Sequence, residues 1–188
     1  MLRVIVNVRH DLDPGEADLE VPAEVKAVEL DRLVSLARQW DKNGDGQELR
    51  HSIYVESLAR FLQSYETLAK ANVWDGAQLR FDTFTAAYFR TSADRKYPLY
   101  RASVTLGRAN LEEEDDAFIN LVGEPQTQTI SRRHAQVFYT KGQWQIVHLS
   151  QTNETSFEQQ ILTFGDRLTL VEGSQLQLGA VKLSFHFG

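Results

Sequence analysis

The chain has 188 residues, of which 42% are hydrophobic, and this length suits one large domain or two small ones. Its formal net charge of −6 argues against general nucleic-acid binding, because that binding depends on neutralising phosphates. The lack of cysteine excludes disulfides and thiolate chemistry and suits a cytoplasmic protein, and no apolar run approaches the ~20 residues needed to span a bilayer.

The first 82 residues are predicted to form two strands, a helix and two further strands. Alternating apolar residues predict a hairpin with a turn at Asp13-Pro14-Gly15. Apolar side chains at helical spacing, Leu33 and Trp40 among them, then predict an amphipathic helix of about three turns. The expected strands cover residues 2–8, 18–21 and 52–55 and a last segment ending at 81, with the helix over 30–40.

This order of elements is similar to the β-grasp arrangement of ubiquitin. Its details resemble the ubiquitin-like domains of type VII secretion systems in Gram-positive bacteria and actinobacteria. Two stretches carry the resemblance: residues 18–25 running into Glu29-Leu30, and Thr67-Leu68 with residues 73–79. They hold strand alternation, a helix start, a turn glycine and a core leucine. Such positions imply architecture rather than function, so the resemblance implies a ubiquitin-like domain over residues 1–82.

The segment after the predicted helix has the first half of a calcium-binding loop. Asp41, Asn43, Asp45 and Gly46 fit the start of an EF-hand, but Ser52 stands where that loop needs a bidentate glutamate. The alternative is a polar turn that uses asparagine, aspartate and glycine for left-handed backbone conformations. We favour the turn and expect no metal site, since the five histidines of the chain also lack metal-ligand spacing.

Residues 83–188 are predicted to form an all-β sandwich. Short apolar segments with frequent turn signals are typical of this class. No linker rich in glycine, serine or proline separates the two halves of the chain. The expected strands cover residues 86–88, 104–106, 135–139, 144–148, 168–170, 176–178 and 181–187.

Three short blocks in this second half suit the binding of a phosphate group. They are Gly107-Arg108, Ser131-Arg132-Arg133-His134-Ala135 and Thr152-Asn153-Glu154-Thr155. A phosphate dianion needs fixed donors, and these blocks offer arginine guanidinium groups and a serine hydroxyl. Charge-assisted bonds from arginine to phosphate are about twice as strong as neutral ones, and loops on a sandwich can hold such donors in place. The alternative is that the blocks are solvated turns.

The order and spacing of these blocks, with the closing run 170–179, resemble a forkhead-associated (FHA) domain, the β-sandwich module that binds phosphothreonine peptides. The resemblance covers roughly the C-terminal half of the chain. It implies that the arginine and serine of the first two blocks bind phosphate and that the threonine-asparagine pair lines the peptide groove. Gly107 and His134 are expected to support the site structurally. The expected phosphopeptide-binding residues are Arg108, Ser131, Arg132, Thr152 and Asn153.

Departures from the FHA pattern affect the expected groove. Glu154 stands where the family usually has glycine, which places a carboxylate beside the groove and predicts an awkward backbone conformation. Residues 148–151 replace the usual Asp-x-Gly-Ser, and the acidic run Glu112–Asp116 lies between two of the blocks. We expect these negative groups to favour phosphothreonine peptides with Lys or Arg flanks. The alternative is that the acidic run is a solvated loop that never meets the ligand.

The sequence favours a two-domain α+β protein, with a ubiquitin-like β-grasp over residues 1–82 and an FHA sandwich over residues 83–188. We expect a non-enzymatic, cytoplasmic adaptor from a bacterium that binds a threonine-phosphorylated protein through the FHA domain and a second protein through the ubiquitin-like domain. A Ser/Thr kinase pathway or a secretion-related assembly would be its setting. Ser131 and His134 lack a third orienting group, so no catalytic residue is expected, and neither is a cofactor, a nucleic-acid partner or membrane insertion. The alternative is a structural subunit whose two domains bind proteins without regard to phosphorylation.

Overall fold

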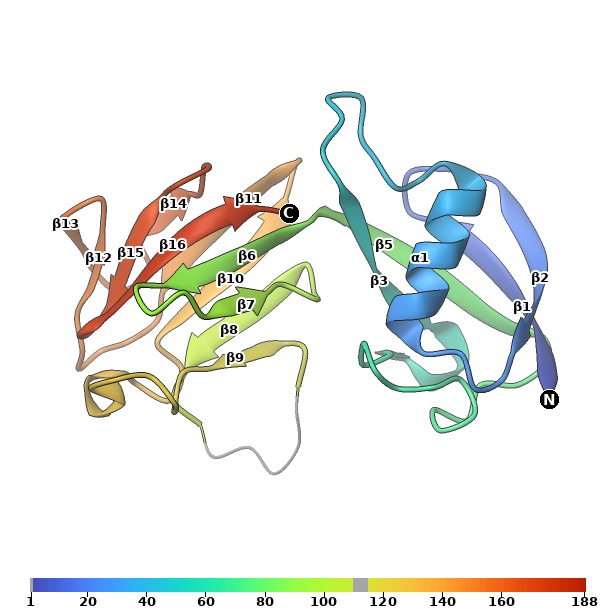
Figure 1. Cartoon of the computed structure of the whole chain (residues 1–188), viewed down its shortest axis with the longest axis horizontal. Coiled ribbons are helices and arrows are strands. Elements are labelled where there is room, and N and C mark those ends of the chain that lie inside the picture. Colours follow the sequence, from blue (N-terminus) through green and yellow to red (C-terminus); the bar gives the residue numbers. More distant parts are fainter. Residues whose placement is uncertain (1, 110–114) are drawn as a thin grey trace. The chain divides into compact units, whose positions relative to one another are not determined.

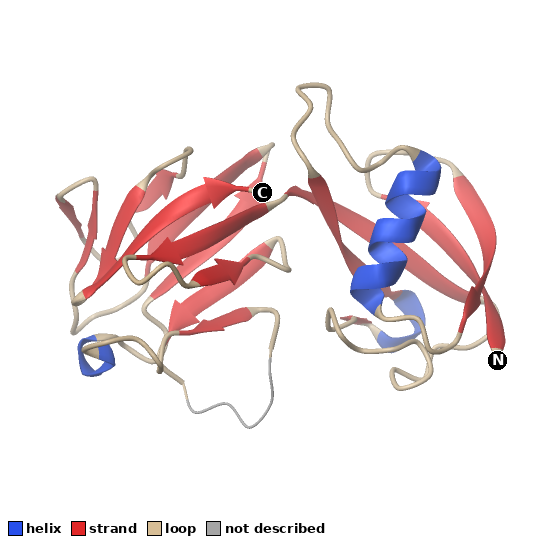
Figure 2. Ribbon diagram, viewed as in Figure 1, coloured by secondary structure: helices blue, strands red, loops and turns tan. Residues whose placement is uncertain are grey.

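The computed structural model of the chain describes residues 2–109 and 115–188 (Figure 1). The chain divides into two compact units, Met1–Phe84 and Thr85–Gly188. Strands make up most of the regular structure in each unit (Figure 2). Within the described ranges, no helix has both the length and the apolar character that a membrane crossing requires.

The first unit is a five-stranded mixed sheet with one α-helix, α1, lying across it (Figure 1). Its elements are β1 (Arg3–His10), β2 (Glu16–Pro22), α1 (Ala27–Arg38), β3 (Leu49–Val55), the 3-10 turn η1 (Glu56–Leu58), β4 (Arg60–Phe61) and β5 (Ala77–Thr85). The strand order is β2-β1-β5-β3-β4, in which β1 runs antiparallel to β2 and parallel to β5. The expected order of two strands, a helix and later strands is therefore present.

Alternation along β1 places one row of side chains in the core of the first unit. Val4, Val6 and Val8 are buried, whereas the residues between them face away from the core. Leu30 and Val34 of α1 belong to the same buried cluster, one helical turn apart. Because full burial of a valine or leucine contributes about 1.5–3 kcal/mol, this row and the helix hold the sheet and α1 together.

The helix differs from its prediction at both ends. It begins at Ala27 rather than at residue 30, and it ends at Arg38 because Gln39 has a left-handed φ of 60°. Trp40 therefore lies beyond the helix. The buried face of α1 is also narrower than predicted, since Leu33 is 59% exposed.

The loop between α1 and β3 is held by the side chain of one asparagine. Oδ1 of Asn43 accepts the backbone N–H groups of Asp45 at 3.0 Å and Gln47 at 2.9 Å. Gly46 has a φ of 79°, a conformation that glycine adopts without steric cost. These contacts are those of a polar turn. They use the side-chain oxygen of Asn43, which a calcium loop would instead offer to the ion.

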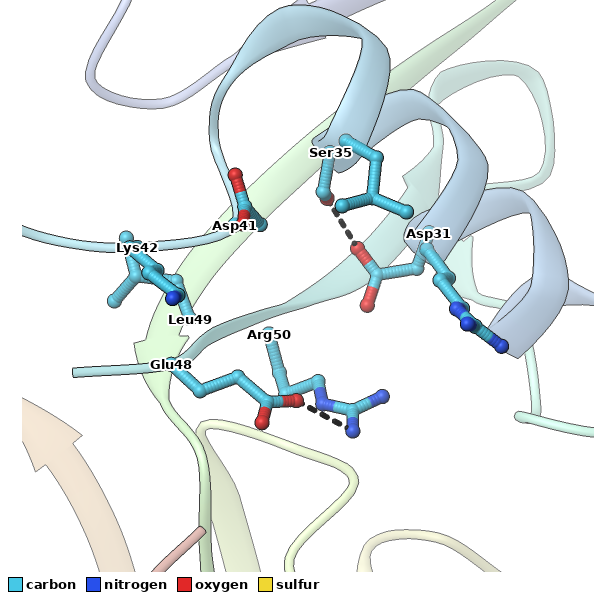
Figure 3. A pocket seen from close by; sticks show the side chains of 9 residues that line it. Asp31, Ser35, Asp41, Lys42, Glu48, Leu49 and Arg50 are labelled. Atoms are coloured by element: carbon cyan, nitrogen blue, oxygen red, sulfur yellow. Dashed lines mark hydrogen bonds and ion pairs between the residues drawn. The ribbon is translucent and has the colours of Figure 1, made fainter. Parts of the chain in front are cut away.

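A buried polar cluster joins α1 to β3. Asp31, which is 5% exposed, accepts a hydrogen bond from Nδ1 of His51 at 2.7 Å and another from the Ser35 hydroxyl at 3.0 Å. Figure 3 shows Asp31 and Ser35 reaching toward each other from α1. A buried carboxylate is costly unless donors surround it, so this cluster favours one placement of the helix on the strand.

A second imidazole extends the cluster to β1. Nδ1 of His10 accepts the backbone N–H of Leu12 at 3.1 Å, so the neutral ring carries its proton on Nε2. That Nε2 lies 3.1 Å from Nε2 of His51, whose own proton is engaged with Asp31. The ring of Trp40 covers His10 at a centroid distance of 4.3 Å. Burial lowers the pKa of His10, an effect that His51 reinforces and nearby carboxylates oppose.

The second unit contains two sheets with a shared core. Its strands and one 3-10 turn are β6 (Ala87–Thr91), β7 (Lys96–Pro98), β8 (Ser103–Gly107), β9 (Phe118–Asn120), η2 (Thr127–Thr129), β10 (Ala135–Thr140), β11 (Gln143–His148), β12 (Thr155–Phe157), β13 (Gln160–Leu162), β14 (Arg167–Thr169), β15 (Gln175–Leu178) and β16 (Val181–Phe187). The sheet orders are β14-β11-β10-β8-β9 and β13-β12-β15-β16-β6-β7. Buried Trp144 of the first sheet meets buried Phe185 of the second at a ring-centroid distance of 6.5 Å, which places the core between the sheets.

Four strands of the second unit were not predicted. They are β7, β9, β12 and β13, each three residues long. A segment of three residues is too short to show an alternating pattern. Of these four, β7 pairs with β6 and was not expected between the predicted strands at 86–88 and 104–106.

The Asp31 cluster can be tested by removing its carboxylate. Asp31→Ala leaves the buried donors of Ser35 and His51 without their acceptor, which should lower the free energy of unfolding of the first unit by roughly 2–4 kcal/mol. Denaturant unfolding followed by tryptophan fluorescence measures this change, since Trp40 lies 6.3 Å from His51 between ring centroids. Asp18→Ala removes an exposed carboxylate from the same unit and should change stability little. Equal effects of the two substitutions would contradict the role given to the cluster.

Candidate functional site

Three loops of the second unit meet at one end of β8 and β10. The first is Gly107-Arg108 at the end of β8, the second is residues 131–134 before β10, and the third is residues 149–154 between β11 and β12. The backbone N–H of Arg108 donates to the carbonyl of Ser131 at 3.0 Å, which joins the first two loops. The carbonyl of His134 accepts two N–H groups of the third loop, each at 3.0 Å. All three predicted sequence blocks are thus brought together.

Gly107 allows the first two loops to approach closely. A Cβ atom at this position would lie 2.0 Å from the carbonyl oxygen of Arg132. That distance is far below any van der Waals contact, so a larger residue would push the loops apart. The side chains of Arg132 and Arg133 themselves are exposed to solvent.

Ser131 lies at the centre of a cluster of hydroxyl and amide groups. Its Oγ is 2.7 Å from Oγ of Ser150 and accepts a hydrogen bond from Nδ2 of Asn153 at 2.9 Å. Ser150 Oγ in turn accepts the backbone N–H groups of Thr152 at 3.3 Å and Asn153 at 2.9 Å. With its acceptor sites used in this way, Ser150 donates its proton to Ser131. The proton of the Ser131 hydroxyl then has Thr152 Oγ1 as a neighbour at 3.4 Å, a long contact that leaves it accessible to a stronger acceptor.

The side chain of Arg108 is oriented beside this cluster. Its Nε donates to the backbone carbonyl of Ile130 at 3.1 Å, one residue before Ser131. The side chain is exposed, so this bond directs a charged group on the surface without burying it. Hydrogen bonds between arginine and phosphate are short and charge-assisted. Arg108 and Ser131 can therefore present a guanidinium and a hydroxyl to one anion.

His134 is buried beneath the cluster and connects two of the loops. It is 0% exposed, and its Nδ1 accepts the backbone N–H of Ser131 at 3.1 Å. The proton of the neutral ring therefore resides on Nε2, which lies 3.1 Å from the carbonyl of Glu154 and 3.0 Å from Oγ1 of Thr155. Burial lowers the pKa of His134 from 6.5 to about 4; the Glu154 carbonyl opposes this shift and His148 adds to it. The imidazole is thus neutral in the folded protein at physiological pH.

Sequence reasoning assigned no role to three residues of this arrangement, although Thr155 and Gly179 stand in stretches that resemble the FHA pattern. Ser150 holds Ser131 and the third loop, the Thr155 hydroxyl joins the rings of His134 and His148, and Gly179 packs behind the site. A Cβ atom at Gly179 would lie 2.3 Å from the carbonyl of Thr129. The signal for Ser150 was its place before a turn, where a serine oxygen often bonds backbone N–H groups two and three residues on. Nothing in the sequence pattern pointed to the other two contacts.

Glu154 does not strain the backbone. It is not among the residues with a positive φ, so the expected awkward conformation is wrong. Its carbonyl accepts the N–H of Gly179 at 2.9 Å as well as the bond with His134, while its side chain is exposed. The backbone of this residue is therefore fixed, and its carboxylate projects from a defined point of the third loop.

Only part of the acidic run can be placed. Residues 112–114 lie outside the described residues. The carboxylate of Asp115 accepts the backbone N–H of Ala117 at 2.9 Å, just before β9. The described end of the run therefore forms a local turn.

Comparison with known proteins supports an FHA domain in the second unit. The model of the FHA domain family matches residues 104–179, a range that contains all three blocks of the site. The match agrees with the all-β sandwich expected for this part of the chain. A comparison with curated proteins gives no match.

Several solved structures, FHA domains among them, are similar to the chain at low identity. One, from a structural and functional analysis of phosphothreonine-dependent FHA domain interactions, is 21% identical with a TM-score of 0.44, over 55% of this chain and 98% of that one. The FHA domain of an Arabidopsis thaliana hypothetical protein is 17% identical with a TM-score of 0.44, over 55% and 86% of the two chains. Mycobacterium tuberculosis EmbR, in complex with a low-affinity phosphopeptide, is 16% identical with a TM-score of 0.46, over 85% and 30%. The assignment of an FHA domain therefore rests on the family match over residues 104–179.

Proposed function

We propose that the second unit binds threonine-phosphorylated segments of another protein at the Ser131 cluster. The observation that carries the proposal is the hydrogen-bond arrangement around Ser131. Asn153 donates to its oxygen, and Ser150, whose own acceptor sites are used by backbone N–H groups, is placed to do the same. The Ser131 proton can therefore turn from its long contact with Thr152 to an incoming acceptor. Arg108 stands beside it as a charged donor, and Arg132 supplies a further exposed cation. These donors suit a phosphate dianion.

The remaining groove residues have roles that follow from their positions. Thr152 is exposed and Asn153 is half-buried on the third loop, where they would line the path of the bound peptide. Gly107 and His134 would support the site without touching the ligand. The backbone of Gly107 packs against that of Arg132, and the side chain of His134 is buried. The family match over residues 104–179 supports this reading, since FHA domains bind phosphothreonine peptides.

The first unit is proposed to be a ubiquitin-like β-grasp domain that binds a second protein. The strand order β2-β1-β5-β3-β4, with a parallel central pair and a helix between β2 and β3, supports this proposal. Together the proposed domains, residues 1–82 and 83–188, would act as a non-enzymatic cytoplasmic adaptor in a bacterial Ser/Thr kinase pathway or secretion-related assembly. The competing possibility, a structural subunit that ignores phosphorylation, predicts equal binding of phosphorylated and unphosphorylated partners.

Substitutions at the two phosphate donors test the proposed site. Arg108→Ala and Ser131→Ala should each weaken binding of a phosphothreonine peptide at least about tenfold, because hydrogen bonds to charged groups contribute ~1.5–3 kcal/mol. Titration calorimetry with a peptide selected from a phosphothreonine library measures the affinities. Arg90→Ala removes an exposed arginine of β6 and serves as the matched control, with affinity expected to be unchanged. Equal affinity of the wild-type protein for phosphorylated and unphosphorylated peptide would contradict the proposal.

His134 should behave differently from the phosphate donors. His134→Ala removes the bonds to Ser131 and Glu154, so it should lower both thermal stability and peptide affinity, whereas Arg108→Ala should lower affinity alone. Because the folded pKa is lowered from 6.5 to about 4, the neutral ring stabilises the fold fully above pH 6.5, and this contribution is lost as the pH falls toward 4.

Denaturant unfolding at a series of pH values between those limits measures this loss. The wild-type protein should lose more stability across the range than His134→Ala, and the difference between the two isolates this residue from the other histidines. Parallel pH profiles for the two proteins would show that His134 is not held neutral by the fold.

A further inference from the structure

A surface hollow lies directly beside the Ser131 cluster. It shares Ser150, Thr152 and Asn153 with that cluster and continues past Glu154 to Leu162 and Phe164, at the end of β13 and just beyond it. A peptide whose phosphate contacts Ser131 would therefore place a neighbouring side chain over this hollow.

The lining of the hollow combines apolar surface with one negative charge. Phe164 is 61% exposed and offers an open ring, and Leu162 forms a buried part of the wall. Glu154 is the one carboxylate among the residues that line it. His148 adds no positive charge at neutral pH, because burial lowers its pKa. Nothing else in the lining carries a charge.

We propose that this hollow, with the carboxylate of Glu154, binds a Lys or Arg side chain close to the phosphothreonine. The proposal deepens the proposed function and rests on it. A Lys or Arg side chain has an apolar stem that can cover Phe164 and Leu162, and a cationic head that can reach a carboxylate. An arginine can also place its guanidinium over the exposed ring of Phe164. Aspartate or glutamate at the same place in the peptide would meet a like charge.

The charges around the site are separated in a way that suits such a peptide. Exposed arginines at 108, 132 and 133 stand on the first two loops, whereas Glu154 stands on the third. The backbone of Glu154 is fixed by His134 and Gly179, so its carboxylate stays on the side of the hollow. A peptide with a phosphate and a nearby cation would match both parts of the surface. Complementary charge of this kind chiefly determines specificity.

The test is a set of phosphothreonine peptides that differ only in one flanking residue. Lys, Gln or Glu is placed in turn at each of the nearest positions on either side of the phosphothreonine, and affinities are measured by fluorescence polarisation. For the wild-type protein, at least one position should favour Lys over Glu by about three- to fivefold, as expected for a partly exposed ion pair. Glu154→Gln should remove this preference, and Glu154→Lys should reverse it.

Glu158→Gln changes the net charge of the same unit equally, at the turn between β12 and β13, and should keep the wild-type preference. The role of Glu154 would be overturned if Glu154→Gln kept the preference for Lys over Glu, or if the wild-type protein showed no such preference at any position while still preferring phosphothreonine over threonine. Either result would leave the proposed function intact. Loss of the preference in Glu158→Gln as well would show a long-range charge effect and would also overturn the role of Glu154. Binding that does not depend on phosphate would overturn the proposed function together with this inference.

Discussion

A single buried imidazole connects the loops on which the candidate site depends. His134 can accept the N–H of Ser131 through Nδ1 only when that nitrogen carries no proton, and its burial keeps the ring neutral. The other nitrogen and the backbone carbonyl of the same residue hold the third loop at Glu154, Leu149 and Ser150. The proposed phosphate donors on these loops are therefore held in position before a ligand arrives, which would reduce the entropy lost on binding.

The two units use buried polar groups for different purposes. In the first unit, the buried side chains of Asp31, Ser35 and His51 bond one another away from solvent. These hydrogen bonds hold the helix to the sheet, so the polar groups of the cluster bond one another rather than a ligand. In the second unit, buried His134 holds the backbone of Ser131, and the guanidinium of exposed Arg108 bonds the carbonyl of the preceding residue, Ile130. Fixed donors next to solvent can bind a ligand, and this difference directs the functional proposal to the second unit.

Much of this arrangement could be predicted from the sequence, and the strands and contacts that were not predicted have physical reasons. Strong alternation and clear turn residues identified the long strands, and the blocks at 107–108, 131–135 and 152–155 identified the site because each loop carries its own polar signature. The short strands β7, β9, β12 and β13 were missed because they are held by pairing with neighbouring strands and show no alternating pattern of their own. The roles of Ser150 and Gly179 were missed because they depend on contacts between segments far apart in the sequence. The error at Glu154 came from expecting a backbone conformation that the chain does not adopt there.

The most direct test of the account is the mapping of a phosphothreonine peptide onto the protein by NMR. Backbone amide shifts are recorded while the peptide is added, and again with the same peptide unphosphorylated. The account predicts that the largest changes occur at Arg108, Ser131, Thr152 and Asn153, that the first unit is unaffected, and that the unphosphorylated peptide causes no comparable change. Largest changes in the first unit, or equal changes with both peptides, would contradict the claim that the second unit reads a phosphate at the Ser131 cluster.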